Sequence, residues 1–372
     1  MSGIYIHIPF CKRKCIYCDF YSIAFSEEKV RQYISAVKTE FENRKDEIDL
    51  SKCSTLYIGG GTPSLLNTYY IKELVSLLKT NQMTEITIEA NPDDVTTEFA
   101  ESIKEIGINR VSMGVQSFND DELRFINRRH DAAKAIKAIE YLKRVGIDNI
   151  SIDLIYGIPN QTPNTWSKSI DTAISLDIKH ISAYSLMYED GTLLTTKRDK
   201  GLITELSDET VVAMYNLLVT KLKAAGFDHY EISNFSLPGW HSRHNSSYWD
   251  FTPYIGLGPS AHSFDGKNRR YNPTSLKVYL EDIQNRGVAY EIEEETINEL
   301  YNEWVMTRLR TKWGLSLASI AEKFGSSFAE FAAPKLQDFA KNGLVNIENG
   351  TATLSDKGIM LSDFVFRELF IV

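Results

Sequence analysis

The chain has 372 residues, more than one average domain, and its 43% hydrophobic and 24% charged residues suit a globular protein with a large core. The formal net charge of −9 argues against long contacts with nucleic-acid phosphates, and no apolar run reaches the length of a membrane span. Only four cysteines are present, and charged residues at 12–14 interrupt the apolar N-terminus. We therefore expect a cytoplasmic protein with neither a disulfide framework nor a secretory signal.

Short apolar runs alternate with amphipathic segments through the first half of the chain. The runs are rich in Ile, Val and Tyr, as buried parallel strands are, and lie at 3–8, 55–58, 85–89, 110–115, 149–155 and 180–185. The helix-like segments between them lie at 27–44, 69–80, 96–106, 132–145 and 163–176. Six βα repeats about 30 residues apart predict an α/β fold, a partial (β/α)6 TIM-like barrel, over residues 1–235.

The pattern changes after residue 225. We assign residues 236–290 to a Pro-, Gly- and aromatic-rich extension of the barrel and residues 291–372 to a mostly helical C-terminal domain. Helices are expected near 296–310, 317–324 and 328–341, and short strands at 344–347 and 351–354 flank the hairpin turn Asn349-Gly350. This order resembles a winged-helix arrangement.

Winged-helix domains often bind DNA, but the charge of this one argues against that function. Residues 293–372 hold eight Lys and Arg against twelve Asp and Glu, whereas a DNA reader normally has a basic surface. The candidate recognition helix carries Lys335 and Lys341 against Glu330 and Asp338. We therefore expect a lid or a partner-binding domain and no nucleic-acid partner.

The strongest chemical signal is the run Cys11-x-x-x-Cys15-x-x-Cys18, directly after the first strand. Three thiolates on one loop can hold three irons of a cubane [4Fe-4S] cluster and leave the fourth iron open to an external ligand. The alternative is a structural zinc bound by the three cysteines and one histidine, for which His7 is available. Cys53 lies apart and is predicted to be a small buried residue.

Polar residues and glycines also mark the ends of successive strands. The run Gly59-Gly60-Gly61-Thr62-Pro63 follows the second strand, where glycines let the backbone approach a ligand, although such a run is also typical of a tight turn. Glu89, Gln116 and Asp153 lie at or near the ends of the next three strands, and Arg128 follows the fourth. Because the C-terminal ends of barrel strands meet at one mouth, these residues predict a functional rim there.

These motifs resemble those of known proteins. The cysteine loop and residues 59–63 resemble the cluster and glycine motifs of radical S-adenosylmethionine (SAM) proteins. Three further segments resemble the oxygen-independent coproporphyrinogen III oxidases and, most closely, the related HemW heme chaperones: Tyr5-Ile6-His7-Ile8-Pro9-Phe10-Cys11, Gly114-Val115-Gln116-Ser117-Phe118 and Asp153-Leu154-Ile155-Tyr156-Gly157.

The resemblance implies a cofactor set and its ligands. Cys11, Cys15 and Cys18 would ligate a [4Fe-4S] cluster, and SAM would chelate the open iron through its amino and carboxylate groups. Nine residues would contact SAM: Tyr5, Tyr17, Gly60, Gly61, Thr62, Glu89, Gln116, Arg128 and Asp153. The chemistry of such proteins is one-electron reduction of the sulfonium, which yields methionine and a 5′-deoxyadenosyl radical.

Three features separate the chaperones from the oxidases. The oxidases carry a further cysteine two positions after the third cluster ligand, where this chain has Phe20. They also carry an N-terminal arm, which we expect to be absent here because the first strand begins almost at Met1. Third, residues 244–249 match the chaperones' His-Asn-x-x-Tyr-Trp motif, which implies heme contacts from His244, Asn245, Tyr248 and Trp249.

The histidine motif has two readings. A neutral imidazole can be an axial iron ligand while Tyr and Trp cover a porphyrin face. Alternatively, Tyr248 and Trp249 pack under the barrel and His244 makes a backbone hydrogen bond. Since the other motifs accompany it, we favour heme, with His241 and then His262 as the next candidate ligands.

The sequence therefore predicts a radical-SAM-type protein that holds heme and delivers it to acceptor proteins without turning over coproporphyrinogen III. The enzyme alternative is SAM-dependent oxidative decarboxylation of coproporphyrinogen III to protoporphyrinogen IX, in porphyrin biosynthesis. A third alternative, neither a heme chaperone nor an enzyme, is a zinc-stabilised regulatory protein. A homodimer is among the assemblies we consider.

Overall fold

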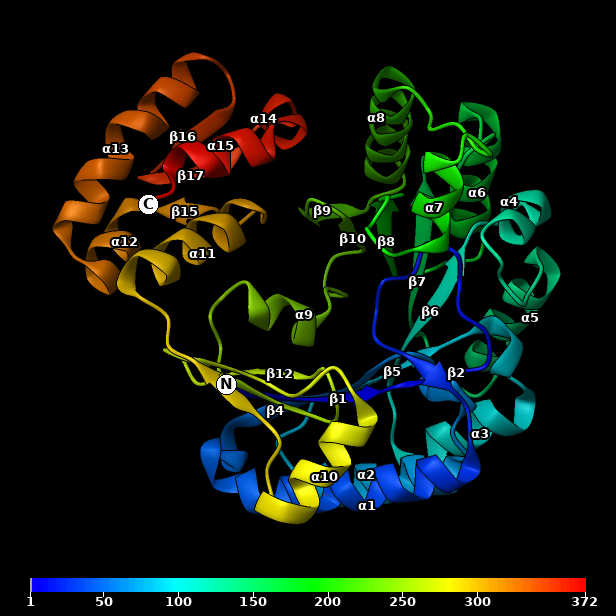
Figure 1. Cartoon of the computed structure of the whole chain (residues 1–372). Helices are drawn as coiled ribbons and strands as arrows, with labels where there is room; N and C mark the ends of the chain where they lie inside the picture. The colour runs from blue at the N-terminus through cyan, green and yellow to red at the C-terminus, as the bar shows by residue number, and fades with distance from the viewer. Residues whose placement is uncertain (1) are drawn as a thin grey trace.

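A twelve-stranded mixed sheet organises the computed structural model, which describes residues 2–372 (Figure 1). Its central strands are parallel and adjacent in chain order: β1 (Ser2–Ile8), β4 (Cys53–Gly60), β5 (Glu85–Ala90), β6 (Arg110–Gln116), β7 (Asn149–Tyr156) and β8 (His180–Ser185). The predicted partial (β/α)6 barrel is confirmed. Its helix crossovers link neighbouring parallel strands, the arrangement that βα repeats favour.

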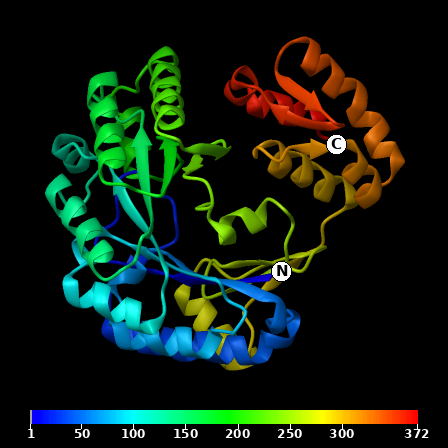
Figure 2. The same ribbon diagram turned by 180° about the vertical axis from the view of Figure 1, so that it is seen from behind.

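Helices cover the outer face of this curved sheet, as Figures 1 and 2 show. They are α1 (Glu27–Arg44), α2 (Thr68–Leu78), α3 (Thr97–Ile106), α5 (Ala132–Arg144), α6 (Pro163–Ser175) and α8 (Asp208–Ala224). Two shorter helices, α4 (Asp120–Phe125) and α7 (Leu193–Asp199), pack beside the loop that holds the first three cysteines. Side-chain caps begin several of them: Thr96, Asp131 and Thr162 each accept a hydrogen bond from the backbone N–H three residues on. The five predicted helices lie within two residues of their expected bounds.

The two faces of the parallel strands differ in polarity. Residues alternate between faces along a strand, so Ile4, Ile6 and Ile8 of β1 pack in the main core, whereas Tyr5 lines the inside of the barrel. Polar residues take the inward positions on the other strands as well, including Glu89 and Asp153. The barrel interior is therefore a polar lumen and not an apolar core.

The segment 236–290 continues the barrel sheet. Strand β11 (Tyr254–Leu257) pairs in parallel with β1, and β12 (His262–Phe264), β13 (Arg269–Tyr271) and β14 (Glu291–Glu293) follow it in antiparallel order. Strands β10 (Asn234–Ser236) and β9 (Asp228–Glu231) form the opposite edge. Helix α10 (Leu276–Arg286) packs on α1, and the short helix α9 (Arg243–Tyr248) packs on β1 and β4. Strands of three or four residues are too short to reveal a periodicity in the sequence.

The C-terminal domain has its own hydrophobic core and a three-stranded sheet. Its elements are α11 (Ile297–Leu309), β15 (Leu315–Ser316), α12 (Leu317–Phe324), α13 (Ser326–Lys341), β16 (Val345–Glu348), β17 (Thr351–Leu354), α14 (Asp356–Met360) and α15 (Ser362–Leu369). Asn349 and Gly350 both have positive φ, at 50° and 76°, which the predicted two-residue hairpin turn requires. The winged-helix-like order expected for this domain is present.

The C-terminal domain contacts the barrel through the end of α11. The backbone N–H of Ile232 donates to the carbonyl of Arg310 at 3.1 Å, and that of Lys312 donates to the carbonyl of Tyr230 at 3.0 Å. The Phe251 ring, just after α9, stacks on the Trp304 ring with centroids 5.2 Å apart. These contacts fix α11 beside the barrel edge. Among residues 2–372, no helix combines the length and apolarity needed to cross a membrane.

Candidate functional site

The cysteine loop is anchored at the mouth of the barrel on both sides. A short parallel pair, β2 (Phe10–Cys11) and β3 (Ile23–Ala24), closes its base. Ile16, between the second and third cysteines, is buried in a small apolar cluster with Ile126, Ile155 and Leu194, on which Tyr17 also packs. The sequence motif shows the thiols, but this anchor appears only in the fold. It holds the loop in place while Cys11, Cys15 and Cys18 remain free and partly exposed.

The three thiols suit a cluster better than a single metal ion. Among residues 2–372, no three His, Cys, Asp or Glu side chains converge closely enough to hold one ion. His7 is also occupied, because its Nε2–H donates to the Tyr21 carbonyl and its Nδ1 accepts from the Tyr5 hydroxyl, both at 3.1 Å. His7 is therefore not free to act as the fourth ligand of a zinc ion in this arrangement. A cubane needs its thiolates on separate irons, and three separate thiols on one loop fit it.

The glycine run brings the end of β4 against this loop. Gly60 has a φ of 111°, and its N–H donates to a Glu89 carboxylate oxygen at 2.9 Å. A Cβ atom on Gly61 would lie 3.0 Å from the Cys11 sulfur and 2.8 Å from the Phe10 carbonyl, so a side chain there would push the two segments apart. Thr62 places its hydroxyl 3.4 Å from the same sulfur. The run is thus more than a tight turn, because it forms a wall of the cysteine site.

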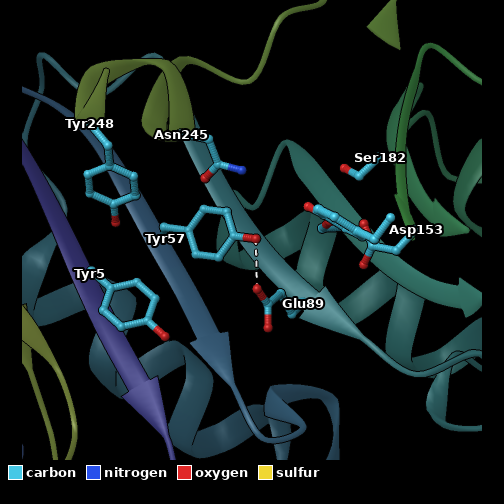
Figure 3. A pocket seen from close by; sticks show the side chains of 9 residues that line it. Tyr5, Tyr57, Glu89, Asp153, Ser182, Asn245 and Tyr248 are labelled. Carbon is cyan, nitrogen blue, oxygen red and sulfur yellow. Dashed lines mark hydrogen bonds between the residues drawn. The ribbon is translucent and has the colours of Figure 1, made fainter. Parts of the chain in front are cut away.

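A cavity of about 210 Å³ occupies the polar lumen below the cysteine loop. Figure 3 shows the side chains that face it, which come from the barrel strands and from α9. The labelled residues are Tyr5, Tyr57, Glu89, Asp153, Ser182, Asn245 and Tyr248. Five of the predicted site residues, Tyr5, Glu89, Asp153, Asn245 and Tyr248, therefore meet in one space.

Two buried carboxyl groups dominate the electrostatics of this cavity. Burial raises the pKa of Glu89 to about 7, although hydrogen bonds from the Tyr57 hydroxyl at 2.8 Å and from Gly60 favour the ionised form. Burial raises the pKa of Asp153 to about 6, against the nearby charge of Arg110. A bound cation would stabilise the ionised form of both carboxyl groups, so the lumen favours cationic ligands.

Arg128 and Gln116 extend the site toward the cysteine loop. Arg128 donates from Nη1 to the Cys15 sulfur at 3.3 Å and from Nη2 to the Asn91 side-chain oxygen at 2.6 Å. Gln116 ends β6 with a φ of 68°, just after an irregularity in its pairing with β7. A non-glycine residue in this region is strained, and such strain collects at functional sites. Both residues lie where the sequence predicted them, at the barrel mouth.

The histidine motif forms α9 and the residue after it, and it is anchored from inside the barrel. The N–H groups of Arg243 and His244 donate to the Glu85 carboxylate at 3.0 and 2.9 Å. The His244 side chain is fully buried, with Nδ1 2.8 Å from the Thr55 hydroxyl and Nε2 2.8 Å from the Tyr248 hydroxyl. Burial lowers its pKa to about 3, so the ring is neutral.

The structure corrects the expected role of His244. Because both ring nitrogens already bond to protein side chains, the ring has no lone pair available to an iron in this arrangement. The alternative prediction, a hydrogen bond from His244 to the backbone, is also wrong, because the partners of the ring are the side-chain hydroxyls of Thr55 and Tyr248. Of the two other candidate ligands, His241 binds Asp228 at 2.9 Å and His262 is exposed on β12. Tyr248 and Trp249 do line cavities.

The barrel and the C-terminal domain each match a known protein family. Residues 5–173 match the Radical SAM superfamily, and residues 296–361 match the HemN C-terminal domain. The chain is 36% identical to the heme chaperone HemW of Bacillus subtilis (strain 168), with 98% of both chains covered. It is 32% identical to heme chaperone HemW of Lactococcus lactis subsp. lactis (strain IL1403), with 100% of this chain and 97% of the relative covered. The chain belongs to the HemW family.

The HemW family shares its architecture with a structurally known enzyme. Coproporphyrinogen III oxidase (HemN) from Escherichia coli, a radical SAM enzyme, superimposes with a TM-score of 0.84 at 25% identity. The superposition covers 99% of this chain and 90% of the other. The predicted family is thus confirmed, including the expectation that HemW proteins are close relatives and that the oxidase shares the fold.

The sequence did not single out several residues that build this candidate site. Thr55 and Glu85 hold α9, and Ser112 and Ser182 line the lumen. Arg110 is buried, and its Nε and Nη1 have no hydrogen-bond partner among residues 2–372. One signal was available: polar residues recur at every second position of strands that are otherwise apolar. That period marks one face of a buried strand as functional.

Proposed function

We propose that this chain is a heme chaperone that carries a [4Fe-4S] cluster and SAM. The observation that carries the proposal is the full-length similarity to heme chaperones named HemW, at 36% identity over 98% of both chains. The histidine motif at 244–249 and the free thiols of the cysteine loop support it. Heme is then cargo, which the chain binds and passes to an acceptor protein.

In this proposal the barrel mouth holds the cluster and SAM. Cys11, Cys15 and Cys18 bind three irons, and Arg128 lies beside Cys15 to balance thiolate charge. When bound, the cluster and SAM supply the one-electron chemistry of the superfamily. Burial raises the pKa of the Cys18 thiol to about 11, so iron binding has to displace its proton.

The lumen residues then orient SAM. The Glu89 carboxylate accepts hydrogen bonds from the ammonium group of the ligand, and Asp153 accepts from ribose hydroxyls. Tyr5 and the Gly60–Gly61 backbone border the same space, next to Thr62 at the cysteine loop. Tyr17, Gln116 and Arg128 close the rim above it. Tyr248 and Asn245 border this space on the α9 side.

The second candidate function is oxidation of coproporphyrinogen III, favoured by the fold shared with the Escherichia coli enzyme. One residue argues against it: Phe20, 66% exposed, stands where those oxidases carry a further cysteine. We propose that the chain binds heme and leaves coproporphyrinogen III unchanged.

Two assays on the anaerobically reconstituted chain test this choice. Titration with hemin should give a saturable Soret change, and incubation with coproporphyrinogen III, SAM and a reductant should give no protoporphyrinogen IX. Formation of that product would establish the oxidase function, and the lack of any saturable heme binding would refute the chaperone. A zinc-containing protein without sulfide would instead support the regulatory alternative.

We place the chain in the cytoplasm, where thiols stay reduced, and expect a heme-acceptor protein as its partner. The C-terminal domain, with eight basic against twelve acidic residues over 293–372, serves as a lid or partner surface and binds no nucleic acid. A homodimer is testable by sedimentation of the cluster-loaded chain.

A further inference from the structure

A second cavity, of about 390 Å³, lies between the barrel and the C-terminal domain. Figures 1 and 2 show the C-terminal domain over the sheet extension, with α9 close to both. One wall comes from the end of α9 and from β11 to β13, and the other from α11. We call this space the interdomain cavity. Within the described range 2–372, only Tyr248 lines both it and the lumen.

The first wall of the interdomain cavity is aromatic. Trp249, Tyr254 and Phe264 face it from α9's end, β11 and β12. Tyr254 packs edge-on against the Tyr248 ring, with centroids 4.7 Å apart. Aromatic rings from three elements around one space suit a large flat apolar ligand. The lumen also presents tyrosine rings, but they lie beside the carboxyl groups of Glu89 and Asp153, which would repel an anionic ligand.

Two arginines face the same cavity, and they differ in how far they are already paired. Arg269 of β13 lies between two carboxylates, with Nε 3.0 Å from Glu303 and 3.4 Å from Glu295. Arg310, at the end of α11, uses Nε and Nη2 on one oxygen of Glu231, at 2.9 and 2.7 Å. Its Nη1 has no hydrogen-bond partner among residues 2–372, and its side chain is 34% exposed. Arg310 therefore has N–H groups available for a ligand carboxylate.

Met306 places a thioether on the same wall. It lies four residues before Arg310, so both side chains project from one face of α11. Iron in heme proteins is bound by His, Cys, Met or Tyr. In the cavity wall the Tyr248 hydroxyl is engaged by His244 and the Tyr254 hydroxyl interacts with the Arg269 side chain, whereas the Met306 sulfur makes no hydrogen bond among residues 2–372. Met306 is thus the available iron ligand on this wall.

We propose that the interdomain cavity is the heme site, with the porphyrin on the aromatic wall, the Met306 sulfur on iron and a propionate on Arg310. This inference rests on the proposed chaperone function and says where in the fold the heme is bound. His244 then acts as a positioning residue, which holds Tyr248 from the lumen side.

The test compares hemin titrations of the full chain and of two conservative variants. In Met306→Leu we expect about tenfold weaker binding, an altered ferric Soret band and loss of the near-infrared charge-transfer band of a thioether-ligated iron. In Arg310→Lys, which keeps a charge beside Glu231, we expect about tenfold weaker binding with unchanged iron ligation.

Matched controls lie outside the cavity. Met187→Leu removes a thioether that is 63% exposed, and Arg198→Lys alters an arginine with the same 34% exposure and with carboxylate partners. Both should bind heme like the unaltered chain, and all four variants should keep the cluster. If both cavity variants match the unaltered chain in affinity and spectrum, the cavity is not the heme site. If the unaltered chain itself binds no heme, the proposed function fails as well.

Discussion

The barrel lumen and the interdomain cavity share Tyr248 but differ in the charge of their walls. The lumen holds two carboxyl groups, Glu89 and Asp153, with pKa values that burial raises to about 7 and about 6. The interdomain cavity holds two guanidinium groups, Arg269 and Arg310, beside aromatic rings. In our proposal, cationic and anionic ligands are therefore separated within one molecule. This separation would let the fold hold a sulfonium cofactor and an anionic porphyrin without competition between them.

The largest expected effect concerns the cysteine loop. Replacing Cys11, Cys15 or Cys18 by Ala should abolish cluster assembly, because in the proposed cluster each thiolate binds a separate iron and none has a substitute. The unaltered chain should contain about four irons and four sulfides after anaerobic reconstitution, as a cubane requires. Iron and sulfide analysis with the visible spectrum measures this.

Cys53→Ala is the control for that experiment, because Cys53 is buried in the main core away from the loop. It should keep the chromophore. Heme titration of the three loop variants sharpens the comparison between the two cavities: an unchanged heme affinity means that the sites are independent, and its loss means that they are coupled.

The next effect separates the lumen from the interdomain cavity by charge. Glu89→Gln should weaken SAM binding by about tenfold to a hundredfold, because a neutral amide replaces the carboxylate that faces the ligand's ammonium. The measurement is the change that SAM causes in the electron paramagnetic resonance spectrum of the reduced cluster. Glu122→Gln, which alters a buried carboxyl bonded to Ser117 and Gln161, is the matched control. A response equal in both variants would contradict the role of Glu89.

The pH dependence of SAM binding should follow the same carboxyl group. Burial raises the pKa of Glu89 to about 7 when no ligand is bound. Below that pH the Glu89 carboxyl is mostly protonated, so it has to lose its proton before it can bind a cation. Affinity for SAM should therefore fall as pH drops below about 7, by up to about tenfold per unit, and level off above it. Asp153, Tyr57 and Arg110 are the other ionisable groups around Glu89. Isothermal titration at about pH 6 and about pH 8 checks this, and Glu89→Gln should flatten the profile.

The raised pKa of Glu89 also affects stability. A carboxyl with a higher pKa in the folded than in the unfolded chain binds more protons when folded. The ligand-free chain should lose stability as pH rises from about 4.5 to above 7, and SAM should reverse this loss. Thermal unfolding with and without SAM measures both.

The smallest expected effect on heme comes from His244. His244→Ala removes a fully buried ring and leaves the hydroxyls of Thr55 and Tyr248 without this partner, which should cost about 2–4 kcal/mol of stability. Heme affinity should fall only about threefold, with an unchanged Soret position, because the residue acts through Tyr248. His262→Ala, on an exposed ring, is the control. A shifted Soret band in His244→Ala would make His244 an iron ligand and overturn its positioning role.

Much of the barrel could be predicted because its signals are local. Buried parallel strands are apolar runs of fixed length, and α1 occupies residues 27–44 as its amphipathic pattern indicates. The hairpin at Asn349-Gly350 follows from two residues that tolerate positive φ. The cysteine spacing and the glycine run are chemical requirements of a site, so they are visible without the fold. The short strands β11 to β14 carry no such signal, because three or four residues cannot show a period.

By itself the sequence determined the βα order, the three thiols, the residues of the rim and the family resemblance, since each depends on residues that are close together in the chain. Only the tertiary structure decided which groups the His244 ring bonds to. One partner, Thr55, lies 189 residues away in the chain, and the ring is held between the Thr55 and Tyr248 hydroxyls. The interdomain cavity likewise exists only after α11 docks on the barrel edge, which places Met306 and Arg310 opposite Trp249. Motif residues identify the chemistry available to a chain, while packing and hydrogen bonds across the fold decide which atoms remain free to perform it.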